Sequence, residues 1–186
     1  MVANGCNWFR ARGSSRSKPG FNWPCERSAQ GVNGPGGTGG RRRGDTYDVL
    51  AGGVVYRVRL LGVDVPEPDQ PFGYQAGDSV TRLLQPERPV LLTRRGLDLY
   101  GRTLATVWLP VAGGPALALD SLLVVRGWAW AWDPKHRVAG RAAQQVAAVA
   151  ARRGLWKCGA VGVLTPRQWW QSNYKNKRRY GVGCTW

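Results

Sequence analysis

Apolar and charged side chains alternate along residues 56–60, and this period of two predicts a β-strand. Val58 and Leu60 would lie on one face of that strand, while Arg59 would lie on the other. The strand should end at Gly62, where a turn follows that carries two acids and two prolines. The same criteria predict strands at 47–50, 54–63, 89–93 and 102–109.

A helical spacing replaces this alternation in the second half of the chain. Val138, Ala142 and Val146 recur on one face of a helix predicted over 137–153, and Gly154 suits its C-terminal cap. Shorter helices are predicted at 78–84 and 116–126. Strands followed by helices indicate an α+β fold, in which about three helices pack against a small β-barrel.

The two ends of the chain differ in composition from its middle. We expect residues 1–40 to be a disordered basic arm without regular structure, or a misassigned start; the other interpretation is a non-specific nucleic-acid arm. Residues 41–170 would form the domain, and 171–186 a basic aromatic tail. Trp169 and Trp170 could stack on nucleobases, or one or both of them could dock on the barrel while the lysines stay in solvent; we favour docking.

The charge of the chain restricts the class of partner. Its 186 residues carry a formal net charge of +16, which favours nucleic acid or an anionic membrane surface. A membrane-surface protein would need a long basic amphipathic helix, and the sequence shows none. No apolar run approaches the roughly 20 residues that span a bilayer, so we expect no integral membrane segment. Because no signal peptide is readable, a cytoplasmic location is the default expectation, and secretion stays open if the start is misassigned.

The chain has four cysteines and one histidine. The cysteines form no CxxC pair, which argues against a zinc site, and without an export signal we expect free thiols. In an exported protein, bridges Cys6–Cys25 and Cys158–Cys184 would be one of three possible pairings. His136 lies in a Pro-Lys-His-Arg loop, where we expect a solvated side chain. Because the chain has no second histidine, a mechanism with paired histidines is excluded.

Five charged residues could together support phosphate chemistry. Asp45 and Asp64 come from different strand ends and would make a hard oxygen site that suits Ca²⁺ or Mg²⁺. Glu67 could activate a water beside the metal. Arg59 and Arg102 could each bind phosphate oxygens and stabilise the charge that develops on phosphorus.

The chain resembles the staphylococcal nuclease-like (thermonuclease) family. The resemblance rests on five segments in the same order, 44–46 (Gly-Asp-Thr), 59–67, 100–102 (Tyr-Gly-Arg), 123–127 and 152–156. It implies an OB-fold with a five-stranded β-barrel and three helices. It also implies Ca²⁺-dependent hydrolysis of DNA and RNA that leaves a 3′-phosphate.

The resemblance also implies a role for each matching residue. The calcium ligands would be Asp45, Asp64 and the backbone carbonyl of Val65. The catalytic residues would be Arg59, Glu67 and Arg102. The substrate-binding residues would be Tyr100, Trp130 and Trp132.

The sequence departs from the family at its first strand and near the metal. The first strand is replaced by residues 39–43, which form a poor strand and leave the closure of the barrel open. Arg43 stands where the family commonly has an acid, and a cation there should weaken Ca²⁺ binding. Leu99 replaces a basic residue, which removes one phosphate contact.

Two functions from different classes follow from these observations. The first is a calcium-dependent nuclease without sugar or strong sequence specificity. The second is a non-catalytic OB-type nucleic-acid-binding module. Three acids facing a polyanion would repel it unless a cation lay between them, which favours the nuclease. We expect DNA and RNA as partners, with single strands preferred, no small-molecule cofactor and a monomer.

Overall fold

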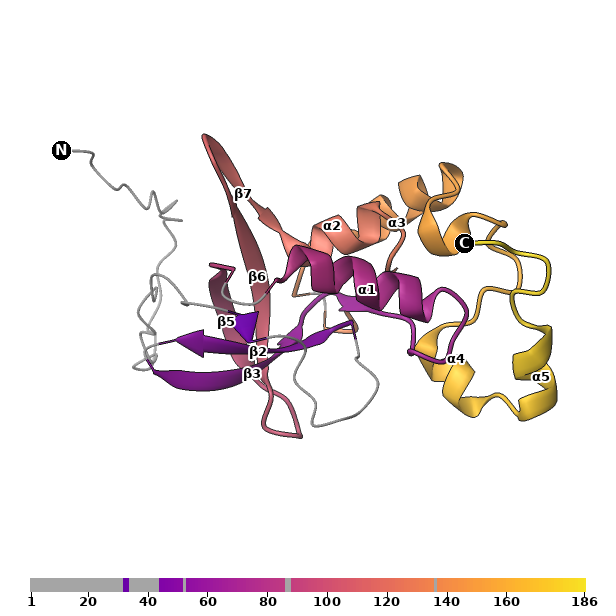
Figure 1. Cartoon of the computed structure of the whole chain (residues 1–186), viewed down its shortest axis with the longest axis horizontal. Coiled ribbons are helices and arrows are strands. Elements are labelled where there is room, and N and C mark those ends of the chain that lie inside the picture. Colours follow the sequence, from indigo (N-terminus) through magenta and orange to yellow (C-terminus); the bar gives the residue numbers. More distant parts are fainter. Residues whose placement is uncertain (1–31, 34–43, 52, 86–87, 136) are drawn as a thin grey trace, which may run out of the picture.

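The computed structural model describes residues 32–33, 44–51, 53–85, 88–135 and 137–186 (Figure 1). Its strands are β1 (Val32–Asn33), β2 (Thr46–Ala51), β3 (Val54–Leu60), β4 (Val63–Asp64), β5 (Leu91–Leu97), β6 (Thr103–Val111), β7 (Gly114–Ala118) and β8 (Trp130–Ala131). Its helices are α1 (Gly73–Leu83), α2 (Leu119–Val125), α3 (Arg141–Ala150), α4 (Pro166–Gln171) and α5 (Tyr174–Arg179), with a 3₁₀ turn η1 (Gly154–Trp156). The expected α+β class is confirmed.

The strands form one main sheet and one small one. The main sheet has the order β1-β2-β3-β6-β5, and β7 adds to β6. The β2–β3 hairpin is antiparallel as expected, whereas β3 and β6 run parallel, with Val58 opposite Thr103. Strands β4 and β8 pair separately and place Asp64 opposite Trp130. A barrel requires its two edge strands to pair. Among the described strands β1 and β5 stay at opposite edges, so the hydrogen-bonded sheet is not closed, a point that the sequence left open.

The three expected helices are present, but their ends differ from the sequence prediction. Helix α3 begins at Arg141 rather than residue 137, because Gly140 precedes it in a left-handed conformation (φ 83°) that a helix cannot continue. Residues 114–118 form β7 instead of the start of α2, since they pair with β6. The C-terminal tail adds α4 and α5, which the sequence analysis did not predict. A capping box at Thr165 and Gln168 starts α4.

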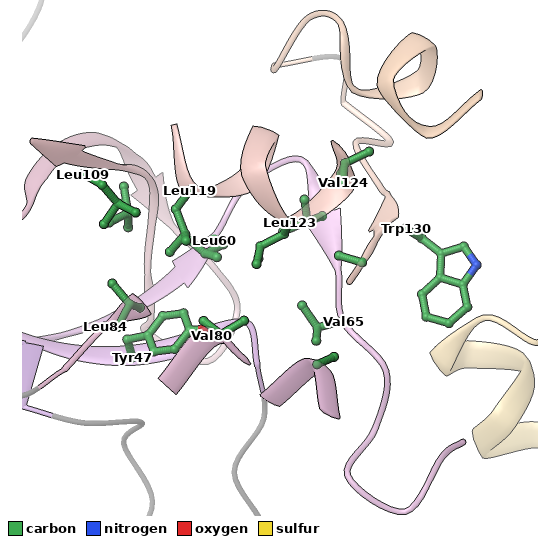
Figure 2. Close-up of a cluster of buried hydrophobic side chains, with 14 of the residues drawn as sticks. Tyr47, Leu60, Val65, Val80, Leu84, Leu109, Leu119, Leu123, Val124 and Trp130 are labelled. Carbon is green, nitrogen blue, oxygen red and sulfur yellow. The ribbon is translucent and has the colours of Figure 1, made fainter. Parts of the chain in front are cut away.

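The hydrophobic core lies between the main sheet and helices α1 and α2 (Figure 2). On β3, Val58 and Leu60 are buried as predicted, whereas Val54 at the start of the strand is 52% exposed. Figure 2 shows Leu60 facing Leu119 and Leu123 of α2, with Val80 of α1 on the other side. The apolar pattern of β3 therefore predicts the core only for the half of the strand that α1 and α2 cover.

A pair of glycines joins the end of α2 to η1. A Cβ on Gly127 would lie 2.1 Å from the carbonyl oxygen of Arg153, and one on Gly154 would lie 2.3 Å from that of Gly127. The N–H of Leu155 donates to the Gly127 carbonyl at 2.8 Å. This close approach brings Trp156 edge-on against Trp130, with ring centroids 5.9 Å apart. The segments 123–127 and 152–156, which each contain one of these glycines, thus meet at a backbone contact.

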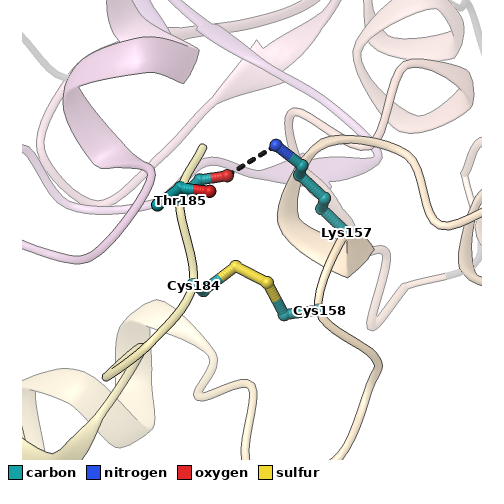
Figure 3. The surroundings of a disulfide bond; sticks show 4 residues. All are labelled: Lys157, Cys158, Cys184 and Thr185. Carbon is teal, nitrogen blue, oxygen red and sulfur yellow. Dashed lines mark hydrogen bonds between the residues drawn. A yellow bond between two sulfur atoms is a disulfide. The ribbon is translucent and has the colours of Figure 1, made fainter.

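A disulfide attaches the C-terminus to the body of the molecule (Figure 3). Cys158, just after η1, is bonded to Cys184, and the Lys157 ammonium donates to the Thr185 carbonyl at 2.6 Å. The expectation of free thiols is therefore wrong for this pair, whose Cα atoms lie 5.9 Å apart, within the usual range for a bridge. Cys6 and Cys25 lie outside the described residues.

A short strand lies within the predicted N-terminal arm. Val32–Asn33, within the arm expected to lack regular structure, form β1 and pair with Val49 and Asp48 of β2. The other predictions for residues 1–40, and those for 39–43 and for His136, lie outside the described residues. Within the described part of the chain, no helix is long and apolar enough to cross a membrane.

Candidate active site

The Asp45 turn is held against the segment that carries Asp64. Gly44 packs on Val65, because a Cβ at Gly44 would lie only 2.6 Å from Val65 Cγ1. The buried Tyr47 hydroxyl donates to the Gly44 carbonyl. Burial, reinforced by the Asp45 carboxylate, raises the pKa of Tyr47 well above its ordinary value, so the hydroxyl stays protonated as a donor. The N–H of Leu60 donates to the Asp45 carbonyl at 2.9 Å, which ties the turn to β3.

Arg59, at the end of β3, lies between the two aspartates. Its Nη2 is 3.2 Å from Asp45 Oδ2 and 3.5 Å from Asp64 Oδ1. Its Nη1 donates to the backbone carbonyls of Leu60, at 2.8 Å, and Val63, at 3.1 Å. The Arg59 side chain is 14% exposed. Two carboxylates from different segments therefore converge on one fixed guanidinium group.

Arg102 joins the same group of side chains through a hydroxyl. Its Nη1 donates to Thr46 Oγ1 at 3.3 Å, and that hydroxyl donates to Asp45 Oδ1 at 2.9 Å. On its other side, Arg102 Nε lies 2.6 Å from Asp98 Oδ2. Desolvation would raise the pKa of Asp98, but hydrogen bonds from Arg102 and from the backbone N–H of Tyr100 outweigh it, and the pKa is lowered. Asp98 therefore stays ionised and fixes Arg102 beside Asp45.

Glu67 lies on the loop between β4 and α1 and is 8% exposed. Trp170 of α4 donates its indole Nε1–H to Glu67 Oε1 at 2.8 Å, across 103 residues of sequence. The backbone of Glu67 is fixed as well. Its N–H donates to Gln70 Oε1 at 3.2 Å, and its carbonyl packs so closely on Gly73 that a Cβ there would lie 1.8 Å away.

The three aromatic candidates for substrate binding differ in exposure. Tyr100 is 83% exposed, and the Arg102 guanidinium lies 5.4 Å from its ring centroid. Trp132 is 49% exposed, and its N–H donates to the Gly62 carbonyl at 3.0 Å. Trp130 is 6% exposed and packs in the core, which leaves little of its surface for a nucleotide.

Comparison with known proteins identifies a matching family. A family model described as "Staphylococcal nuclease homologue" matches residues 57–158. The chain belongs to this family. The matched residues contain Arg59, Asp64, Glu67 and Arg102, whereas Asp45 lies just before them.

Relatives of this staphylococcal nuclease homologue include named nucleases. Protein ParB of Escherichia coli is 37% identical over 123 residues, which cover 61% of this chain and 67% of that protein. Micrococcal nuclease of Shigella flexneri is 38% identical over 93 residues, which cover 48% of this chain and 53% of that protein. Thermonuclease of Staphylococcus intermedius is 44% identical over 73 residues, which cover 36% and 44% of the two chains.

A metal ion would need oxygen ligands, and Asp45 and Asp64 place carboxylate oxygens beside Arg59. The described residues contain no group of three or more His, Cys, Asp or Glu side chains that could hold one. The pair Asp45 and Asp64 would therefore need backbone carbonyls and water to complete a coordination shell, as hard cations usually recruit. Val65, next to Asp64, has its side chain buried against Gly44.

Three residues of the site were missed by sequence reasoning. Asp98 had a signal, since an acid four residues before Arg102 in a turn is typical of a side chain that binds nearby backbone N–H groups. Thr46 acts through a hydroxyl whose partners are Asp45, in the turn before β2, and Arg102, just before β6 and far away in the sequence. Trp170 had no local signal, because only the tertiary fold brings α4 to Glu67.

Proposed function

We propose that this staphylococcal nuclease homologue is a Ca²⁺-dependent nuclease that hydrolyses phosphodiester bonds of DNA and RNA. The observation that carries the proposal is the convergence of Asp45, Asp64 and Arg59, with Arg102 joined to them through Thr46. Two fixed cations beside paired carboxylates suit a phosphate that must be bound and polarised. The names of two relatives, micrococcal nuclease and thermonuclease, support the same activity.

The residues present fit a calcium ion. Asp45 and Asp64 each place one carboxylate oxygen within 3.5 Å of the same Arg59 nitrogen, so two carboxylates lie close together. Carboxylate and carbonyl oxygens are the ligands that Ca²⁺ prefers. Asp45, Asp64 and the Val65 carbonyl would hold the ion. When bound, it would supply positive charge that polarises a phosphate oxygen and makes a nearby water more acidic.

The side chains of the site would divide the hydrolysis among them. Arg59 and Arg102 bind the scissile phosphate and stabilise the negative charge that grows on it. Glu67 accepts a proton as water forms its bond to phosphorus, and the bond from phosphorus to the 5′-oxygen breaks. The 5′-oxygen leaves as a hydroxyl after taking a proton from solvent, and the phosphate stays on the 3′-oxygen. Trp170 keeps the Glu67 carboxylate oriented by donating to Oε1.

The contacts available to the substrate do not depend on the identity of its bases, so we expect cleavage without strong sequence preference. Arginine contacts to phosphate do not read sequence, and exposed aromatic rings stack on any base of a single strand. Of the three aromatic candidates, Tyr100 and Trp132 are exposed, whereas Trp130 is buried on the strand that pairs with Asp64. We infer single-stranded DNA and RNA as preferred substrates of a monomer whose nuclease domain spans residues 41–170.

The experiment that tests this function is cleavage of a labelled single-stranded oligonucleotide with Ca²⁺ and with chelator. Wild type should cleave only with the metal, and Glu67→Gln should lose about 10²–10⁴-fold in kcat while it keeps its affinity for the oligonucleotide. Asp48 of β2 pairs with the exposed Arg57 at 3.0 Å and not with the site, so Asp48→Asn is a control that should cleave as wild type does. Metal-independent cleavage, or an unchanged rate for Glu67→Gln, would contradict the proposal.

A non-catalytic nucleic-acid-binding module is the second candidate, and one observation favours it. The Arg59 guanidinium itself lies between Asp45 and Asp64, so the two acids have a counter-charge without a metal ion. The presence of acids facing a polyanion therefore no longer requires a bound cation. Wild-type protein that binds the oligonucleotide with and without Ca²⁺ but never cleaves it would identify the module.

A further inference from the structure

The C-terminal helices carry several exposed aromatic rings and cations. Trp170 at the end of α4 is 62% exposed, and Tyr174 at the start of α5 is 73% exposed. Lys175, Arg178 and Arg179 on α5 are exposed, and the helix sequence YKNKRR contains no acid. We name these five residues the basic aromatic face.

The other side of these helices is used for packing, which fixes the orientation of the basic aromatic face. Trp169, next to Trp170, is 4% exposed, and its ring lies 5.8 Å from that of Tyr180. The Lys177 ammonium lies 4.7 Å over the Trp169 ring, so this lysine belongs to the packed side. The Leu164 carbonyl, just before α4, accepts from the side chain of Gln70 at 2.6 Å. The basic aromatic face is therefore exposed on helices that are themselves held against the body of the protein.

The basic aromatic face begins at the proposed catalytic carboxylate. Trp170 belongs to the face through its exposed ring and to the site through the hydrogen bond from its Nε1 to Glu67 Oε1, at 2.8 Å. In Figure 1, α4 and α5 lie side by side beyond the loop that leads into α1. The Arg178 guanidinium lies 5.5 Å from the Tyr174 ring centroid. A cation that can bind phosphate therefore lies beside an aromatic ring on which a base can stack. A strand bound with its scissile phosphate at the site would thus meet this face next.

We propose that the basic aromatic face is an accessory binding site for the single-stranded nucleic acid, taking nucleotides that flank the scissile phosphate. The proposal rests on the proposed function, because it extends the same substrate beyond the site. Exposed rings that stack on bases, next to cations that follow the backbone, are the combination that binds single strands without sequence preference. An anionic membrane is the less suitable partner, since six-residue α5 is too short for an amphipathic membrane helix.

The test compares two triple variants that remove equal charge. The first is Lys175→Ala/Arg178→Ala/Arg179→Ala on the basic aromatic face. The matched control removes exposed cations from other helix ends, Arg82→Ala/Arg126→Ala/Arg152→Asn, with Asn at position 152 because its φ of 50° is left-handed. Binding of a fluorescent oligonucleotide of about 20 nucleotides is measured in chelator, so that no cleavage occurs.

The face variant should bind the oligonucleotide about tenfold or more weakly than the control, and its salt slope should fall by about 2, at roughly 0.7 per lost phosphate contact. Tyr174→Ala, a second variant that leaves the charge intact, should weaken binding about fivefold or more through lost stacking. With Ca²⁺, KM for the oligonucleotide should rise more in the face variant than KM for a dinucleotide.

Several results would overturn the accessory site. Equal weakening in both triple variants would show that only net charge matters. Equal effects on the oligonucleotide and the dinucleotide would place the residues in the reaction itself. Loss of binding to phosphatidylserine vesicles with unchanged oligonucleotide binding would assign the face to a membrane. Wild-type protein that binds the oligonucleotide strongly but never cleaves it would contradict the proposed nuclease activity and leave the accessory site standing, because the binding measurement does not depend on cleavage.

Discussion

At the scale of single residues, the site depends on partners that hold each charged group in place. Arg59 is fixed by two backbone carbonyls, Arg102 by Asp98, and Glu67 by Trp170. Such pre-arranged groups stabilise a transition state without having to reorganise during the reaction. Removing a supporting partner should therefore lower the rate even though the reacting side chain is unchanged.

Trp170→Phe tests this argument at Glu67. Phenylalanine keeps an aromatic ring for stacking but removes the N–H that donates to Glu67 Oε1. Because a hydrogen bond to a charged group contributes about 1.5–3 kcal/mol, kcat should fall about tenfold or more with little change in KM. Trp108→Phe is a matched control, since it loses an indole bond to Thr93 Oγ1 within β5–β6. A rise in KM with unchanged kcat would leave Trp170 a substrate contact only.

Asp98→Asn tests how Arg102 is fixed. Asparagine keeps an oxygen for the backbone N–H groups but removes the charge beside Arg102. Because the pKa of Asp98 is lowered in the folded state, its ionised form stabilises the fold above the unfolded pKa of about 3.9, and this contribution is lost as the pH falls through the folded pKa. The difference in unfolding free energy between wild type and Asp98→Asn should be constant above about pH 5 and shrink in stronger acid.

The measurement is urea denaturation across this pH range, with Asp78→Asn as the control. Asp78 pairs with Arg82, whose side chain is 80% exposed, and such surface pairs contribute little. If the difference in unfolding free energy between wild type and Asp98→Asn grows as the pH falls, the ionised Asp98 carboxylate does not stabilise the fold through Arg102.

At the scale of elements, the loop between β4 and α1 is fixed by the first turn of α1. The Gly73 N–H donates to the Gln70 carbonyl at 2.8 Å, and the Gln70 N–H donates to the Glu67 carbonyl at 2.9 Å. Helix α1 buries Ala76 and Val80 in the core, so it cannot move away from the loop without losing packing. The position of Glu67 is therefore determined by how closely α1 approaches it.

Gly73→Ala should displace Glu67. The new Cβ would lie 1.8 Å from the Glu67 carbonyl oxygen, a backbone atom that cannot rotate away. We expect a loss of about 1–3 kcal/mol in stability from overpacking, together with a lower kcat. Gly114→Ala is the control, because its Cβ would meet only Val111 Cγ1 at 3.8 Å. Thermal unfolding and single-strand cleavage measure both effects, and full activity in Gly73→Ala would refute the argument.

Sequence reasoning succeeded where the determining contacts are local and failed where they are distant. The hairpin of β2 and β3 follows from alternation and a glycine turn, and the sequence brought Asp45, Asp64 and Arg59 together because they flank that hairpin. It could not find β1, since Val32–Asn33 become a strand only by pairing with β2. The contact of Trp170 with Glu67 spans 103 residues, and no periodic pattern reports such a contact.

At the scale of the whole molecule, the tail is part of the folded body. The Cys158–Cys184 bridge closes a segment of 26 residues that contains α4 and α5. The last residue, Trp186, packs against Phe72 beside α1, with ring centroids 6.2 Å apart. The bridge, Trp186 and Trp170 attach the same segment at separate points. The tail therefore contributes both to stability and to the position of Trp170.

Cys158→Ser/Cys184→Ser should loosen this segment. Opening a loop of 26 residues costs about 3 kcal/mol by the chain-entropy argument, or about 10 °C in Tm for a chain of this size. Calorimetry of the oxidised wild type and the variant measures the shift, and limited proteolysis should cut the variant first within 159–186. Dithiothreitol should lower the Tm of wild type toward that of the variant. Because the loosened segment carries Trp170, kcat on single-stranded DNA should fall with Tm, and equal Tm values in the oxidised proteins would show that the bridge does not hold the tail.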